Sequence, residues 1–237
     1  MPADTPASHI LPDNATTSTA RPPDCDTACS YDARGLVISM TDTDILAAVL
    51  DYYGRGYDPT PVEYRGKKAV LEGWQKRHLG EEALRGLFAQ PYNIGIVLGA
   101  ASGGLVDVDL DTPQAIIVAR HLLPATARFG HRSNPASHYL YRARGEVKTR
   151  RFKAPDGTCI AELRAEGAQT VVPPSIHESG EHIEWELDCE PLAIEAADLT
   201  RLVALVAAAA LLARSWPAQG SRHDASLALG GGLLRLP

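Results

Sequence analysis

The chain has 237 residues, of which 45% are hydrophobic and 22% are charged, and its formal net charge is −6 at pH 7. These values are ordinary for a soluble globular protein and exclude a wholly disordered, collagenous or coiled-coil chain. The longest uncharged apolar stretch, residues 202–213, is shorter than the ~20 residues that a membrane span needs. It therefore predicts a buried helix and no membrane partner. An acidic chain is not an obvious nucleic-acid binder unless its bases are concentrated in one region.

Three regions follow one another along the chain. Residues 1–40 are rich in Pro, Thr, Ser, Ala and Asp and lack apolar periodicity, which predicts a disordered tail. Residues 41–195 alternate helical patterns with strand-like segments and predict one α+β domain. Residues 196–237 predict a helix, a linker and the start of a further helical module, so we expect the chain to be part of a longer protein.

The elements of the central domain are predicted from hydrophobic periodicity and from capping residues. Helices are expected over residues 45–53, 80–88 and 113–121, the last one starting at a Thr-Pro pair that suits a helix N-terminus. A further helix is expected over residues 196–215. Strands are expected over residues 60–64, 93–99, 105–111, 138–142, 159–164, 170–172 and 183–187.

The four cysteines give little indication of a metal or disulfide framework. Cys25 and Cys29 form the one close pair, and the chain offers no second pair or spaced histidines beside it, so a structural zinc site is a weak alternative. Cys159 and Cys189 stand alone. The N-terminus lacks the basic and apolar regions of a signal peptide, which predicts free thiols and a cytoplasmic location.

The strand predicted over residues 105–111 carries the most informative motif, which places Asp107, Asp109 and Asp111 at every second position. Side chains alternate along a strand, so the three carboxylates are expected on one face, ~6.6 Å apart along the strand. Carboxylates this close repel one another unless a cation lies between them, and their oxygens suit Mg²⁺ or Mn²⁺. A solvated strand end is the alternative. A calcium-binding loop is excluded, because Thr112 and Val118 occupy the positions where it needs Gly and Glu.

Later segments add groups that suit a phosphate ligand. Ser137 and His138 begin a strand in a basic neighbourhood, although a histidine in a structural role is the common alternative. Glu162 and Arg164 share one face of the next strand, where they could add a third carboxylate and a triphosphate clamp, or form an exposed ion pair. The run Pro173-Pro174-Ser175-Ile176-His177 predicts a rigid turn that presents a hydroxyl and an imidazole.

Basic residues are concentrated between residues 128 and 153, where eight bases face one acid, Glu146. Unbalanced like charges repel and normally have an anionic partner, and a polyanion bound here would show salt-sensitive affinity. A solvated face is the alternative. The eight bases are Arg128, Arg132, Arg142, Arg144, Lys148, Arg150, Arg151 and Lys153.

These segments, in this order, resemble the bifunctional DNA primase/polymerase domain, a branch of the archaeo-eukaryotic primase superfamily. The resemblance covers residues 41–195. The segments that carry it are Gly66-Lys67-Lys68 with Gly73-Trp74, Asn93-Ile94-Gly95-Ile96 with Gly99, the aspartate strand, Ser137-His138, Glu162-Leu163-Arg164 and Pro173-Pro174-Ser175-Ile176-His177.

The resemblance implies an archaeo-eukaryotic primase-like α+β core. This core combines an antiparallel catalytic sheet like that of an RNA-recognition motif with a second small α/β unit, and a C-terminal helix follows it. The family's acidic pair falls on Asp109 and Asp111, with Asp107 as a possible extra ligand. Glu162 stands where many relatives carry Asp, which keeps the charge and can change the metal geometry. His138 takes the place of the histidine that contacts the phosphates of the incoming nucleotide.

The resulting hypothesis is template-directed nucleotidyl transfer with two Mg²⁺ or Mn²⁺ ions as cofactors. The metal ligands would be Asp107, Asp109, Asp111 and Glu162, and the catalytic residues Asp109, Asp111, Glu162 and His138. The nucleotide contacts would be Ser137, His138, Arg164, His177 and Lys67, with Lys68 as an alternative to Lys67. The contacts to the DNA backbone would be Arg132, Lys148, Arg150 and Arg151.

The expected partners are a single-stranded DNA template and dNTP or NTP substrates. Such domains commonly continue into a helicase and serve the replication of a plasmid, phage or integrated element, so a helicase module is expected beyond residue 237. Two other classes stay open from the residues alone. A metal-dependent nuclease would use the same acids without the triphosphate contacts, and a non-catalytic binding module would keep the basic residues without metal dependence.

Overall fold

The computed structural model describes residues 42–235. The disordered tail predicted over residues 1–40 lies outside this range, as do Cys25 and Cys29. Within the range, Cys159 forms no disulfide.

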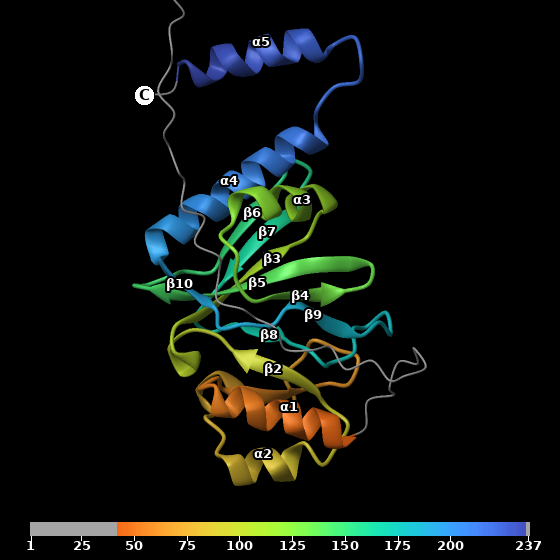
Figure 1. Ribbon diagram of the computed structural model, residues 1–237, viewed down its shortest axis with the longest axis vertical. Helices are drawn as coiled ribbons and strands as arrows, with labels where there is room; N and C mark the ends of the chain where they lie inside the picture. Colours follow the sequence, from red (N-terminus) through yellow and green to blue (C-terminus); the bar gives the residue numbers. More distant parts are fainter. Residues whose placement is uncertain (1–41, 236–237) are drawn as a thin grey trace, which may run out of the picture. The chain divides into compact units, whose positions relative to one another are not determined.

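Five α-helices and ten strands make up the described part of the chain (Figure 1). The helices are α1 (Asp42–Gly54), α2 (Glu81–Leu87), α3 (Pro113–Leu122), α4 (Ala196–Arg214) and α5 (Arg222–Leu233). The strands are β1 (Pro59–Val62), β2 (Asn93–Val97), β3 (Leu105–Leu110), β4 (Arg128–His131), β5 (Asn134–Arg144), β6 (Arg150–Lys153), β7 (Cys159–Arg164), β8 (Gln169–Val171), β9 (Ile183–Leu187) and β10 (Leu192–Glu195).

The strands form two sheets. The smaller sheet has the order β1-β2-β8, and the larger one has seven strands in the order β6-β7-β3-β5-β4-β9, with β10 beside β5. Every pair is antiparallel except β5 with β10. Antiparallel sheets with helices on their outer faces agree with the predicted α+β class.

The two sheets and the helices are arranged in layers. Helices α3 and α4 cover one face of the larger sheet, while the smaller sheet with α1 and α2 lies on its other side (Figure 1). One apolar core lies between the larger sheet and α3 and α4, and it includes Val106, Val108 and Val203. A second core includes Leu105 of the larger sheet together with Ile94 of the smaller one. The larger sheet is therefore covered on both faces.

Burial on both faces explains where the aspartates of β3 lie. Val106, Val108 and Leu110 point into the core under α3 and α4, as the alternation predicts. Asp107 and Asp109 point to the other face, where the smaller sheet covers them, and Asp107 is completely buried. The alternative of a solvated strand end does not describe these two residues.

Helix α4 buries one face and exposes the other. Leu199, Val203, Val206, Ala207 and Ala210 are buried in the core shared with α3 and the larger sheet. Leu205 and Leu212 on the opposite face are exposed, so the helix predicted to be buried over residues 202–213 is buried on one face only. By length and composition alone, α4 is also long and apolar enough to cross a membrane. The core helix of a soluble protein meets the same two criteria. The domain boundary at residue 195 stays a prediction. It would separate α4 from the core against which this helix is packed.

Several strands were not expected from the sequence. Strand β5 begins at Asn134, four residues before the predicted strand, and β4, β6 and β10 were not predicted as strands. The residues of β6 are mostly exposed, so they show no apolar alternation, and they form a strand because they pair with β7. Short edge strands of this kind are defined by tertiary pairing rather than by local pattern.

Candidate functional site

Three neighbouring strands bring the predicted acids and the histidine together. In the antiparallel register, Asp109 on β3 lies opposite His138 on β5 and opposite Glu162 on β7. Directly opposed residues point to the same face of a sheet, with Cβ atoms ~5 Å apart. Three residues that are far apart in the sequence therefore lie side by side on the face that the smaller sheet covers.

His138 is held by two aspartates. Its Nδ1 lies 3.0 Å from Oδ2 of Asp107, and its Nε2 lies 3.6 Å from Oδ1 of Asp109. The His138 ring also stacks on Phe129, with ring centroids 4.7 Å apart. Burial opposes a charged imidazole, but the two carboxylates outweigh it and raise the pKa of His138. Burial likewise opposes ionisation of Asp107, yet His138 and Arg164 lower the pKa of its carboxyl.

Arg164 connects the acids with the smaller sheet. Its Nη2 donates to Asp109, and its Nη1 donates to the carbonyl oxygen of Gln169 on β8 at 3.0 Å. The same guanidinium lies 3.9 Å from Asp107 and 4.0 Å from Glu162. Desolvation opposes the charge, but these carboxylates raise the pKa of Arg164. A buried cation among three carboxylates balances charge that would otherwise be costly to bury.

Asp111 lies one residue beyond the end of β3 and is exposed. The carboxylates of Asp111, Glu162 and Asp109 all act on the Cys159 thiol, whose pKa burial and these charges raise to about 12. Asp109 and Asp111 also line one pocket. Two of the aspartates share a strand face as predicted, and Asp111 joins them from the loop after the strand.

A bulge shapes the strand that carries Ser137 and His138. Phe129 pairs with His138 and His131 pairs with Asn134, so one residue lies between the two pairs on β4 and three lie between them on β5. Ala136 takes a positive φ of 51° in this bulge. Bulges re-aim side chains and are frequent beside active sites. Here the bulge lets the consecutive residues Ser137 and His138 both line one pocket.

Gly130 is required by the close approach of the bulged chain. A Cβ atom at this position would lie 2.4 Å from the carbonyl oxygen of Asn134 and 2.7 Å from the backbone nitrogen of Ala136. Both neighbours are backbone atoms and cannot rotate away. The glycine therefore permits the bulge that presents Ser137 and His138.

Strands β3, β5 and β7 of the larger sheet form one wall of the site. The smaller sheet and the loops beside it form the opposite wall. The side chain of Gln169 on β8 donates to the carbonyl oxygen of Lys67 at 2.9 Å, which fixes the Lys67 turn beside the site. The amide side chain of Asn93 both donates to and accepts from the backbone of Ile176, at 2.7 and 3.0 Å. This pairing holds the loop that carries His177. Two of the segments on which the resemblance rests are thus bonded to each other.

His177 lies in a small polar cluster with His131. The two rings stack with centroids 4.1 Å apart, and Nδ1 of His131 lies 2.6 Å from Oε2 of Glu181. The Ser133 hydroxyl and His131 lower the pKa of Glu181 to about 2. Desolvation together with the nearby charges of His131 and Lys67 lowers the pKa of His177. His131, His177 and Glu181 can each place one ligand atom within 4.8 Å of the others, which is compatible with a metal ion.

The two walls enclose a cavity of about 200 Å³, which we call the catalytic pocket. Most of the predicted catalytic and nucleotide-contacting residues line it. They are Lys67, Asp109, Asp111, Ser137, His138, Arg164 and His177. Glu162 lies at its edge, next to Arg164 and within 2.9 Å of Nε of Arg151.

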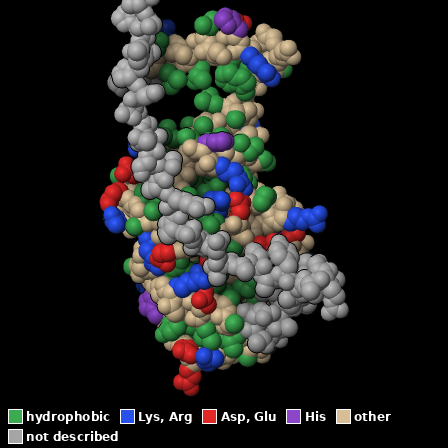
Figure 2. Space-filling model, in the orientation of Figure 1, with side chains coloured by type: hydrophobic (Ala, Val, Ile, Leu, Met, Phe, Trp, Pro, Cys, Tyr) green, Lys and Arg blue, Asp and Glu red, His purple; other side chains and the backbone are tan. Residues whose placement is uncertain are grey.

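The basic stretch differs from its sequence-based interpretation. Five of its eight bases lie within 4 Å of a carboxylate, and four of these acids come from outside the stretch. Basic and acidic side chains accordingly lie interspersed on the visible face (Figure 2). Of the predicted DNA contacts, Lys148 and Arg151 are paired, whereas Arg132 and Arg150 form no ion pair within residues 42–235. The bases are Arg128, Arg142, Arg144, Lys148 and Arg151, and their partners are Glu186, Glu190, Glu195, Glu146 and Glu162.

A protein-family model matches the central part of the chain. The model of the family described as bifunctional DNA primase/polymerase, N-terminal, matches residues 49–198, which is more than half of the chain. The chain belongs to this family. Membership confirms the resemblance and indicates DNA primase/polymerase activity, which is a nucleotidyltransferase activity. A search of curated proteins found no match.

Some residues of the candidate site were not expected from the sequence. His131 and Gln169 line the catalytic pocket and were not proposed as site residues. The sequence could have indicated His131, because it lies in the same short segment as Ser137 and His138. It could not have indicated Gln169, because the role of this residue depends on the pairing of β8 with β2 and on the position of the Lys67 turn.

Proposed function

We propose that the catalytic pocket carries out template-directed nucleotidyl transfer on single-stranded DNA. The observation that supports this most directly is the register of β5, β3 and β7, which sets His138, Asp109 and Glu162 side by side. A row of acids and an imidazole faces a wall that carries Lys67 and His177. Acids on one side and phosphate-binding groups on the other suit the transfer of a phosphoryl group.

The donor set fits two Mg²⁺ or Mn²⁺ ions. Asp109, Asp111 and Glu162 supply hard oxygen ligands close to one another, which these ions prefer. Asp107 is completely buried beneath His138, so we assign it to positioning His138 rather than to direct metal binding. When bound, the metal would lower the pKa of the attacking 3′-hydroxyl and neutralise the leaving pyrophosphate.

The chain's own residues would bind and orient the triphosphate. Asp107 and Asp109 raise the pKa of His138, which favours an imidazolium that can donate to a phosphate oxygen. The Ser137 hydroxyl is buried without a hydrogen-bond partner and lines the catalytic pocket, which suits a donor reserved for substrate. Lys67 and His177 would approach the phosphates from the opposite wall.

Arg164 and Arg151 each contact a proposed metal ligand. Arg164 donates to Asp109, and Nε of Arg151 lies 2.9 Å from Glu162. A divalent ion at these carboxylates would compete with both guanidinium groups and release them toward the triphosphate and the DNA backbone. We assign the backbone contacts to Arg132, Lys148, Arg150 and Arg151, which would give affinity without reading sequence.

The finer fold assignment is also a proposal. Strands β7, β3, β5 and β4 lie side by side in that order, and α3 connects β3 to β4. This order is compatible with a sheet like that of an RNA-recognition motif, with α4 packed beside α3 on the same face. A helicase module beyond residue 237, a role in the replication of a mobile element and a cytoplasmic location stay predictions.

One assay tests the proposed function. Single-stranded DNA, with and without a primer, is incubated with labelled dNTPs or NTPs and with Mg²⁺ or Mn²⁺. We expect primer synthesis or extension that EDTA abolishes and that the double variant Asp109→Ala/Asp111→Ala lacks. Asp156→Ala is the matched control, because this exposed aspartate pairs with Arg214 away from the catalytic pocket.

The other outcomes separate the alternative functions. Degradation of the DNA without incorporation of nucleotides would favour a metal-dependent nuclease that uses the same acids. Metal-independent DNA binding without any product, unchanged in the double variant, would favour a non-catalytic binding module. Either result would overturn nucleotidyl transfer.

A further inference from the structure

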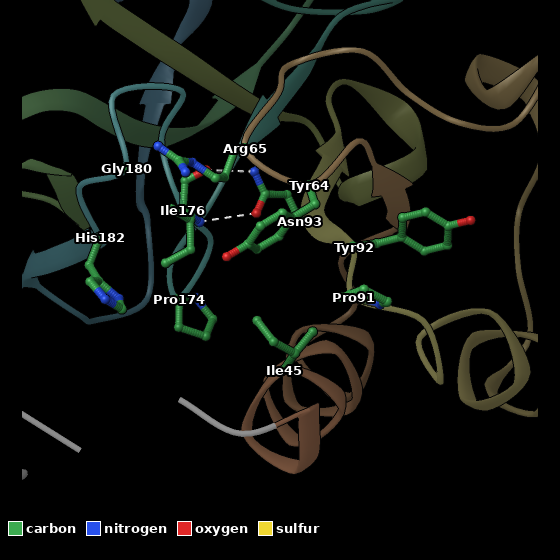
Figure 3. A pocket seen from close by; sticks show the side chains of 10 residues that line it. All are labelled: Ile45, Tyr64, Arg65, Pro91, Tyr92, Asn93, Pro174, Ile176, Gly180 and His182. Atoms are coloured by element: carbon green, nitrogen blue, oxygen red, sulfur yellow. Dashed lines mark hydrogen bonds between the residues drawn. The ribbon is translucent and has the colours of Figure 1, made fainter. Parts of the chain in front are cut away.

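A second cavity, of about 520 Å³, lies beside the catalytic pocket and has no role in the proposed chemistry (Figure 3). We call it the Tyr64 groove. Its floor is apolar and includes Ile45, Pro174 and Ile176, and its rim carries Tyr64 and Arg65.

Two chain segments line both cavities. The turn after β1 gives Tyr64 and Arg65 to the groove and, two residues later, Lys67 to the catalytic pocket. The loop after β8 gives Ile176 to the groove and the next residue, His177, to the catalytic pocket. A flexible polymer that leaves the catalytic pocket across this loop would therefore enter the groove.

The groove presents an aromatic ring to solvent. Tyr64 is 58% exposed, although a ring of this size usually buries its faces. In Figure 3 the Tyr64 ring is directed across the groove toward Pro174 and Ile176. An exposed ring above an apolar floor can stack with a planar group, and nucleobases stack on aromatic side chains irrespective of their sequence.

The groove also presents an uncompensated cation. Arg65 makes no hydrogen bond or ion pair among the described residues, and the residues that line the groove include no carboxylate. The backbone of Arg65 takes a left-handed φ of 53°, an unusual conformation for a residue other than glycine. Its guanidinium lies over Gly180, where a Cβ atom would come within 2.7 Å of Nη2. A strained residue that points a free cation into a groove suits a functional contact.

We propose that the Tyr64 groove binds one or two nucleotides of single-stranded DNA, with a base stacked on Tyr64 and a phosphate on Arg65. The proposal rests on the proposed function for the identity of the polymer, since the strand that passes both cavities would be the template. An acidic peptide could also bind Arg65. Peptide binding would not explain why the groove and the catalytic pocket share two chain segments.

The test uses the full chain and a fluorescently labelled single-stranded oligonucleotide of deoxythymidine. Tyr64→Ala removes the ring, and Arg65→Gly removes the cation while allowing the left-handed backbone at no strain. Tyr53→Ala and Arg77→Gly are matched controls, because both residues are exposed and neither lines either cavity. Binding is measured by anisotropy over a range of salt concentrations.

We expect Tyr64→Ala to weaken binding about tenfold without a change in salt dependence, because base stacking is uncharged. Arg65→Gly is expected to reduce the slope of log K against log salt by about 0.7, the value for one lost phosphate contact on a single strand. Each control should stay within about twofold of the wild type. Tyr64→Phe keeps the ring and should bind as the wild type does, because stacking needs the ring and not the hydroxyl.

Several results would overturn the groove proposal. One is equal binding by Tyr64→Ala, Arg65→Gly and their controls, and another is the absence of single-strand binding by the wild type. If free dTTP competes as effectively as the unlabelled oligonucleotide, the groove is a mononucleotide site instead. If a polyglutamate peptide displaces the labelled oligonucleotide and the unlabelled oligonucleotide does not, the groove is a peptide site.

Failure of the proposed function is a separate result. Nucleotide incorporation by the wild type is measured in parallel, and its absence would overturn nucleotidyl transfer whether or not binding depends on Tyr64. If incorporation occurs and the variants bind like their controls, the groove proposal alone is wrong.

Discussion

The two walls of the catalytic pocket are built in different ways. One wall is carried by three paired strands of the larger sheet, whose register places Asp109 opposite both His138 and Glu162. The other is carried by a turn with Lys67, the three-residue strand β8 and the loop with His177. The strand wall is rich in carboxylates, whereas the loop wall carries a lysine and an imidazole.

This difference separates two tasks. Paired strands fix side chains to within a fraction of an ångström, which groups at the reacting atoms require. Turns and loops hold charge near the pocket with less precision, which is sufficient for binding a flexible triphosphate. We therefore expect changes in the strand wall to act mainly on kcat and changes in the loop wall to act mainly on KM.

The largest effect is expected from Glu162→Gln on the strand wall. Loss of one proposed metal ligand should lower kcat for nucleotide incorporation by about 10²–10³-fold, a size typical of losing one charge-stabilising group. The measurement is steady-state primer extension at saturating dNTP. Glu184→Gln, an exposed carboxylate on β9, is the control and should leave kcat unchanged. A change in KM with normal kcat would contradict the proposed role of this wall.

The bulge behind His138 provides a second test. In Gly130→Ala the new methyl group meets backbone atoms at 2.4 and 2.7 Å, and overpacking of this kind costs about 1–3 kcal/mol in the free energy of unfolding. Urea denaturation measures this loss. In Gly86→Ala, on α2, nothing lies within 4 Å of the added methyl group, so this variant should be as stable as the wild type or up to about 1 kcal/mol more stable. Equal stability of the two variants would show that the bulge is not needed.

A smaller effect is expected from Lys67→Ala on the loop wall. Removal of a charge-assisted contact to phosphate at an exposed position should raise KM for dNTP by roughly fivefold, about 1 kcal/mol, with little change in kcat. Lys68→Ala is the matched control, because Lys68 is the next residue and does not line the pocket. A loss of kcat in Lys67→Ala with unchanged KM would remove the distinction between the walls.

The smallest effect concerns the titration of Glu181 beside the loop wall. The Ser133 hydroxyl and His131 lower the pKa of Glu181 to about 2, below the ordinary value of ~4.3 for glutamate. A depressed pKa contributes stability that is present above the ordinary value and is lost as the pH falls toward about 2. Ser133→Ala should raise the pKa of Glu181 toward its ordinary value, which NMR titration of the side-chain carboxyl carbon detects. An unchanged midpoint would contradict the assigned hydrogen bond.

Much of the site could be predicted from local pattern. The alternation around Asp107 and Asp109 predicted a strand with its acids on one face, and the structure has that strand. The ion pairs of the basic stretch could not be predicted, because Arg128 and Arg142 meet Glu186 and Glu190 only after distant segments pack together. The same holds for β6, whose exposed residues form a strand only beside β7.

The sequence by itself determined which chemical groups are present and on which strand faces they lie, because side-chain alternation is a local property of the backbone. Tertiary structure alone decided how those groups meet. The register of β3 with β5 and β7, the smaller sheet that buries Asp107 and the bulge at Ala136 all depend on contacts between residues far apart in the chain. Burial is what pairs Asp107 with His138 and Arg164, since a carboxylate in the interior needs a cation beside it.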